Sequence, residues 1–170
     1  MANQGVHFAL TAEDVGVLRR FESDGDRLDH LQEVFEEEYL SSDRSENRYA
    51  AESDKAWDAI HRVLADGRLT WDGGEYPLNH TILGGELLYG EPDYIMSLKF
   101  PEQVKDIAKA LERIDFEHFR SRYLAIDSQD YGFPLTDEDL EYTWEWFQAV
   151  KEFYRAAAET DRYVLFTADQ

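Results

Sequence analysis

Apolar residues recur at helical spacing in several separate segments of the chain. The clearest stripe follows Pro101, which suits the first position of a helix. Residues 54–66 predict another helix, capped by Ser53 and ended by Gly67. Thr136 begins a capping pattern that predicts a long helix to about residue 158. These segments supply most of the predicted helical structure.

The N-terminal region combines a short apolar run with two helical patterns. Residues 6–10 predict a buried strand, and Thr11 with Asp14 forms a capping box for the helix that follows. This helix stops near residues 23–25, and a second helix continues through the acidic residues 36–38. The polar stretch 41–53 has no sustained apolar period and predicts a surface loop.

Strand signals are few and separated along the chain. Residues 94–100 and 163–167 are apolar runs that predict strands, and residues 123–126 suggest a further short one. Residues 69–77 predict a hairpin-like excursion around the Asp72-Gly73 turn, and residues 129–135 a loop. Several helices with scattered strands favour one α+β domain over residues 1–170, with helices packed on a small, mainly antiparallel sheet.

The charge balance narrows the range of partners. The chain has 170 residues, with 17 basic and 37 acidic side chains and a net charge of −20. Such a protein repels nucleic acid and anionic membranes, and it attracts a basic protein partner by long-range steering. Solubility alone is the alternative explanation of this charge. No cysteine, signal peptide or membrane-length apolar segment is present, so a cytoplasmic location is expected.

The predicted helix 54–66 carries the best candidate for acid–base chemistry. Asp54, Asp58 and His61 fall on one broad face at helical spacing, and Trp57 lies on the adjacent apolar stripe. A carboxylate one turn from an imidazole can raise the pKa of that imidazole and fix its tautomer. Structural capping and local pairing explain the same residues equally well.

No cofactor or specific metal site is expected. The histidines are scattered, and nothing resembles a His-Glu-x-x-His motif. Gly84-Gly85 matches neither glycine-rich phosphate loop and predicts a tight turn.

The predicted C-terminal helix is crowded with aromatic residues on more than one face. Trp146 lies two residues after Trp144 and therefore on roughly the opposite side of the helix. Either two layers enclose the helix, or an aromatic patch rimmed by Glu141, Glu145 and Glu152 reaches the surface. Such a patch is typical of a protein-binding site that includes Trp146, whereas core packing of the aromatic residues is the favoured interpretation.

Several motifs resemble the YfbM-like family of bacterial proteins. The most specific is the segment Asp-Lys-Ala-Trp-Asp-Ala-Ile-His at residues 54–61. Agreement extends to residues 5–11, 77–78, 82–85, 88–89, 93–95 and 101–104. The resemblance covers nearly the whole chain and implies a small α+β fold. The family is uncharacterised, so the resemblance carries no catalytic residue.

Three functions remain open at this point. The favoured one is a non-enzymatic binding protein, such as an inhibitor or immunity-type partner of a basic protein. The second is an enzyme with a small-molecule pocket near Asp54, Asp58, His61 and Tyr89, with Asp58 and His61 as the acid–base pair. The third is a structural or oligomeric protein. The candidate binding residues are Asp54, Trp57, Asp58, His61, Tyr89 and Trp146.

Overall fold

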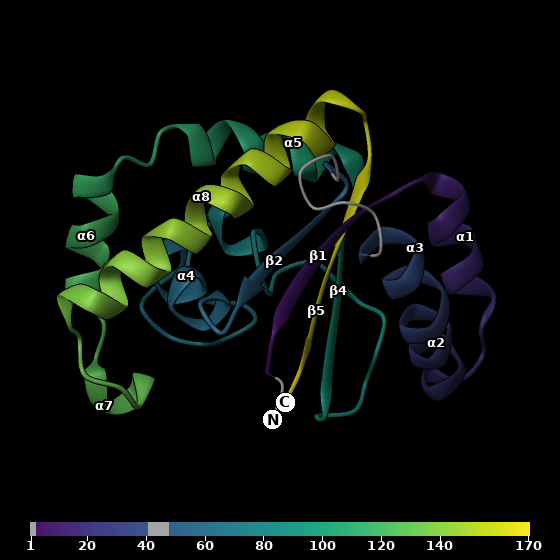
Figure 1. The fold of residues 1–170 in the computed structure, drawn as a ribbon, viewed down its shortest axis with the longest axis horizontal. Helices are drawn as coiled ribbons and strands as arrows, with labels where there is room; N and C mark the ends of the chain where they lie inside the picture. The colour runs from purple at the N-terminus through teal and green to yellow at the C-terminus, as the bar shows by residue number, and fades with distance from the viewer. Residues whose placement is uncertain (1–2, 41–47) are drawn as a thin grey trace.

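The structure, a computed structural model, describes residues 3–40 and 48–170. Within these residues, five strands form one antiparallel sheet in the order β2-β1-β5-β4-β3. The strands are β1 (Gly5–Leu10), β2 (Ala50–Asp54), β3 (Glu86–Leu87), β4 (Tyr94–Lys99) and β5 (Tyr163–Asp169). The start of β1 and the end of β5 lie side by side in the sheet, where Gly5 is opposite Ala168 (Figure 1).

Helices cover both faces of the sheet. Figure 1 shows α1, α2 and α3 on one side and α4, α5, α6 and α8 on the other. The first layer contains α1 (Ala12–Arg20), α2 (Asp24–His30), the π-helix η1 (Leu31–Phe35) and α3 (Glu36–Leu40). The second side holds α4 (Trp57–Leu64), the 3₁₀-helix η2 (Leu78–His80), α5 (Pro101–Glu112), α6 (Phe116–Leu124), α7 (Ser128–Tyr131) and α8 (Asp137–Glu159).

Alternation along the strands divides the core into two layers. In β1, Phe8 and Leu10 pack with the N-terminal helices, whereas Ala9 packs with α4, α5 and α8. Phe166 of β5 lies in the second layer with Trp57. Successive side chains of a strand point to opposite faces, so a sheet covered on both sides buries both sets. The α+β class predicted from the sequence is confirmed.

The predicted helix starts at Thr11, Pro101 and Thr136 agree with the structure. The Thr11 hydroxyl accepts a hydrogen bond from the Asp14 backbone N–H, and the Asp14 carboxylate accepts one in return from Thr11. Pro101 opens α5, and the Thr136 hydroxyl caps α8 by accepting from Asp139 N–H. These contacts satisfy backbone donors that lack partners inside the helix.

The region between α3 and α4 differs from the prediction. Of the expected surface loop 41–53, residues 41–47 lie outside the described part, and residues 50–53 belong to β2. Because residues 50–54 pair with β1, α4 begins only at Trp57, and Ser53 is a buried strand residue instead of a helix cap. Pairing with β1 therefore overrides the local preference of this segment.

Four smaller predictions differ from the structure. Residues 69–77 contain no strand, so the expected hairpin is absent there. Tyr123 and Leu124 end helix α6 instead of forming a strand, and α7 lies at the start of the expected loop 129–135. The turn expected at Gly84-Gly85 is a close approach to β4, because a Cβ on Gly85 would lie only 2.4 Å from the Leu98 carbonyl oxygen.

No helix of the described residues combines the length and apolarity needed to cross a membrane.

Candidate functional site

Asp58 and His61, the predicted acid–base pair, have different partners in the structure. The Asp58 carboxylate accepts a hydrogen bond of 2.6 Å from Arg62 Nε, one turn further along α4. Arg62 Nη1 also donates to the carboxylate of Asp130 at 2.6 Å, which ties α4 to α7. Burial raises the pKa of Asp58, although the Arg62 guanidinium opposes this shift. Asp58 therefore belongs to an ion-pair network that joins two helices.

His61 is a core residue. Its side chain is fully buried, and Nε2 donates to the Thr70 carbonyl oxygen at 2.9 Å. This bond requires the proton on Nε2, and it leaves Nδ1 buried without a hydrogen-bond partner within the described chain. Burial lowers the pKa of His61 to about 4, so the ring is neutral near pH 7. The His61 imidazole thereby holds the loop that contains Thr70 against α4.

Tyr89 lies on the other side of the sheet from α4. Its hydroxyl donates to Asp93 at 3.1 Å, and its ring packs against Tyr94 with the N-terminal helices. It lines a shallow cavity of about 430 Å³ together with Arg19, Asp24 and Arg27. The convergence of Tyr89 with Asp54, Asp58 and His61 on one pocket was therefore predicted wrongly, because the sheet separates them.

Trp57 anchors the start of α4 in the core. It is 2% exposed, its indole Nε1 donates to the Asn3 carbonyl at 3.1 Å, and its ring lies 5.7 Å from that of Phe166. A buried indole with a satisfied N–H is a packing residue. Trp57 has no surface available for a ligand.

Asp54 and Trp146 are the predicted site residues that the structure brings together. Both line a small cavity of about 290 Å³ beside Gln4 and Glu52. The Asp54 carboxylate also accepts a hydrogen bond of 2.6 Å from Tyr142, whose ring packs edge-on against that of Trp146. This cavity lies where the end of β2 meets α8.

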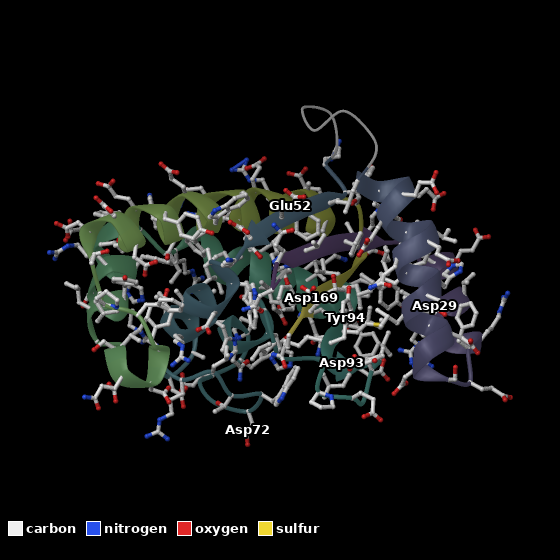
Figure 2. The ribbon with its side chains drawn as sticks, turned by 60° about the horizontal axis from the view of Figure 1, so that its bottom comes forward. Asp29, Glu52, Asp72, Asp93, Tyr94 and Asp169 are labelled. Carbon is white, nitrogen blue, oxygen red and sulfur yellow. The ribbon has the colours of Figure 1, made fainter. Side chains whose placement is uncertain are left out.

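A larger groove adjoins this cavity and shares Glu52 and Trp146 with it. Its volume is about 540 Å³, and it runs between β2, the outermost described strand, and one face of α8. Its apolar lining consists of Leu40, Ala50, Ala51, Trp146, Ala149, Phe153 and Ala156. Its charged rim consists of Arg48, Glu52, Glu152 and Glu159. We call this surface the edge groove; Figure 2 shows Glu52 on β2 beside α8.

Small residues on α8 keep the edge groove open. Trp146, Ala149, Phe153 and Ala156 recur at spacings of three and four, which places them on one helix face. Ala149 is exposed and Ala156 is half-buried, so two positions that larger side chains would fill remain empty. The aromatic surplus of α8 is thus divided: Phe147 and Tyr154 are core residues, Phe153 is a core residue that also contributes to the groove lining, and Trp146 borders the groove.

Among the described residues, the rim carries the carboxylates of Glu52, Glu152 and Glu159 and the guanidinium of Arg48. Arg48 Nη2 lies 3.9 Å from Glu159 Oε2, and Arg155 Nη1 lies 3.5 Å from Glu152 Oε2. All four side chains of these two pairs are more than half exposed, and such ion pairs contribute little stability. A cationic ligand can therefore replace these contacts at small cost.

Comparison with known proteins gives a family and a fold. The sequence profile of a domain of unknown function, DUF1877, matches residues 1–167. The chain belongs to the DUF1877 family. A search of curated proteins finds no match. Among solved structures, the protein of unknown function YfbM from Escherichia coli is similar, with 19% sequence identity and a TM-score of 0.67. The alignment covers 97% of this chain and 99% of YfbM, which confirms the resemblance predicted from the sequence.

The described part of this DUF1877 protein also has a buried polar cluster that the sequence did not reveal. Lys99 is fully buried, and its Nζ donates to the Ile82 carbonyl oxygen at 2.5 Å with no ion-pair partner within the described residues. His7 is equally buried, and its Nδ1 has no hydrogen-bond partner in the same part of the chain. Burial lowers the pKa of both groups. The sequence signal for the burial of Lys99 was the alternation of side chains along β4, because it turns Lys99 toward the same face as Ile95.

Among residues 3–40 and 48–170, no group of three or more His, Asp or Glu side chains is arranged to hold a metal ion. The edge groove is the candidate site, and its chemistry is apolar contact beside acidic residues.

Proposed function

We propose that this DUF1877 protein is a non-enzymatic binding protein whose edge groove takes an apolar, basic segment of a protein partner. The observation that carries this proposal is the groove itself, an apolar hollow of about 540 Å³ whose described rim includes the exposed carboxylates of Glu152 and Glu159. An inhibitor or immunity-type role toward a basic protein is one specific form of this function.

The shape and lining of the groove support a peptide-sized anchor site. Its volume lies within the range of roughly 300–1,000 Å³ that is typical of ligand pockets. Trp146, which is half-buried, provides aromatic surface, which is enriched where interfaces gain most of their binding energy. Burying one apolar side chain of leucine or phenylalanine size contributes about 1.5–3 kcal/mol, so one or two anchors suffice for measurable binding.

The charge of the protein selects the partner. Glu37 and Glu38 are exposed on α3, whose last residue Leu40 lines the groove, and the net charge of the chain is −20. This field accelerates the approach of a cationic partner and opposes that of an acidic one. The basic residues of the partner then meet the rim, while its apolar residues enter the hollow.

Selection from a displayed library of random peptides about 12 residues long tests this function. The wild-type protein is the target, and Ala149→Trp, which fills the groove, is the counter-target. Enrichment of peptides that combine lysine or arginine with apolar residues, and that bind more weakly as salt increases, supports the proposal. Recovery of no groove-dependent peptide, or of acidic peptides that bind both proteins equally, refutes it.

A further inference from the structure

We propose that the basic partner segment binds in extended form and adds to the sheet as a further strand alongside β2. This inference rests on the proposed function, because it specifies how the segment occupies the edge groove. It assigns the recognition to backbone hydrogen bonds of β2 as well as to the side chains of the groove.

The sheet offers two edges, and they differ in length. Strand β2 is the outermost described strand on one side and contains five residues, whereas β3 on the opposite side contains only two. At the β3 edge, the Arg19 guanidinium pairs with the Glu86 carboxylate at 2.6 Å. An added strand needs several consecutive backbone contacts, and β2 alone has the required length.

The register of β1 and β2 shows which backbone groups face the groove. Phe8 is opposite Ala50 and His7 is opposite Ala51, and Ala9 N–H donates to the Tyr49 carbonyl oxygen at 2.8 Å. Residue pairs in an antiparallel ladder alternate between bonded and non-bonded. Ala51 is therefore bonded to β1, whereas Ala50 directs its N–H and C=O away from β1. Ala50 also lines the edge groove, and among the described residues its outward N–H and C=O have no hydrogen-bond partner, so they can pair with a neighbouring strand.

The two sides of the groove match the alternating side chains of a strand. Trp146 and Phe153 on α8 border it from one side of the sheet, and Leu40 at the end of α3 borders it from the other. A strand seated about 4.8 Å from β2 would point successive side chains toward these two sides. Apolar residues facing α8 would meet the aromatic rings, and basic residues would reach Glu152 and Glu159 on the rim.

Charge excludes a second copy of this chain as the added strand. Two copies with a net charge of −20 each repel one another, and Glu52 would lie within each paired edge. Natural sheets use charged residues on edge strands to prevent self-association. The same charges favour a basic segment, so the edge that resists self-pairing is suited to a cationic partner.

Hydrogen exchange measured by NMR tests this geometry with the tightest peptide from the selection. We expect the Ala50 amide to become protected at least about tenfold when the peptide binds, because it gains a hydrogen bond. The Ala51 amide serves as the internal control, since it is already bonded to β1. A scan of the peptide with single backbone N-methyl groups should weaken binding at alternate residues only.

A pair of variants provides an independent readout. Ala50→Pro removes the outward N–H and retains the bonds to β1, and we expect it to weaken binding at least about tenfold; Ala50→Ser, which keeps the N–H, should bind normally. If Ala50→Pro does not fold, the exchange and N-methyl measurements still decide whether the peptide adds to the sheet as a strand. Peptides can bind in the groove without protecting the Ala50 amide from exchange and without the alternating effect of N-methyl groups. That result overturns strand addition and leaves the proposed function intact. Absence of any groove-dependent peptide refutes both.

Discussion

The Tyr142 hydroxyl donates a 2.6 Å hydrogen bond to the Asp54 carboxylate, and this contact joins α8 to the end of β2. The two residues are 88 positions apart in the chain and come from the two elements that form the edge groove. Asp54 adopts a positive φ of 44°, a backbone conformation that is uncommon for residues other than glycine. The bond therefore fixes the separation of β2 and α8 at one end of the groove.

A double-mutant cycle measures the strength of this link. Tyr142→Phe and Asp54→Ala each remove one partner, and we expect a coupling free energy of about 1–2 kcal/mol in urea unfolding, as for a half-buried bond to a charged group. Additive effects of the two substitutions would show that the contact does not stabilise the fold.

The buried imidazole of His61 predicts a loss of stability in mild acid. Its pKa is about 4 in the folded protein, against an ordinary value of 6.5, so between these values the unfolded chain binds more protons. The free energy of unfolding should therefore fall as the pH drops from 6.5 to 4, by up to about 3 kcal/mol from this group.

The matched variants for this prediction are His61→Gln and His118→Gln. His61→Gln keeps a donor for Thr70 and should give a shallower decline of stability with acid than the wild type. His118 is exposed, and its replacement should leave the wild-type slope unchanged. Unfolding in urea at several pH values is the measurement, and parallel slopes for all three proteins would contradict the account.

The Arg62 network predicts a structural role for Asp58. Arg62 is 5% exposed and bonds both Asp58 and Asp130, and its guanidinium lies over the Tyr131 ring at 5.5 Å. Arg62→Met should lower the free energy of unfolding by about 2 kcal/mol, since Asp130 is half exposed and regains water. Arg120→Met, at an exposed position, should change it by less than about 0.5 kcal/mol. Equal effects of the two substitutions in urea unfolding would disprove this role.

The acidic rim predicts a salt-dependent rate of association. Glu152→Gln with Glu159→Gln should slow association of the selected basic peptide by about two- to tenfold at low salt and flatten its salt dependence. The control is Glu112→Gln with Glu117→Gln, which makes the same charge change at exposed positions away from the groove. Stopped-flow fluorescence measures both. Equal slowing by the two double variants would assign the effect to net charge and remove the rim from the account.

The helices could be predicted from the sequence because their starts are marked by local chemistry. Thr11, Pro101 and Thr136 act on backbone groups within three residues, so the necessary information is contiguous. Strand β2 could not be predicted in this way. Its sequence Ala-Ala-Glu-Ser-Asp has no β-branched residue, and pairing with β1 about 40 residues earlier makes it a strand.

The candidate site was only partly predictable for the same reason. Helical spacing showed that Asp58 can reach one turn along α4, but Arg62 at the fourth position competes with His61 and holds Asp58. Trp146 was identified by its position on the aromatic helix. The groove beside it depends on β2, which the sequence did not reveal, so its lining by Ala149 and Ala156 became apparent only in the structure.

The binding affinity of the selected basic peptide for Ala149→Trp and Gln148→Trp tests the central claim most directly. Both substitutions add an indole at an exposed position of α8, but only residue 149 lines the edge groove. With both variants folded as judged by circular dichroism, we predict that Ala149→Trp weakens binding at least about tenfold, whereas Gln148→Trp stays within about twofold of the wild type. Equal affinity of all three proteins for the peptide would contradict the assignment of the groove as a binding site.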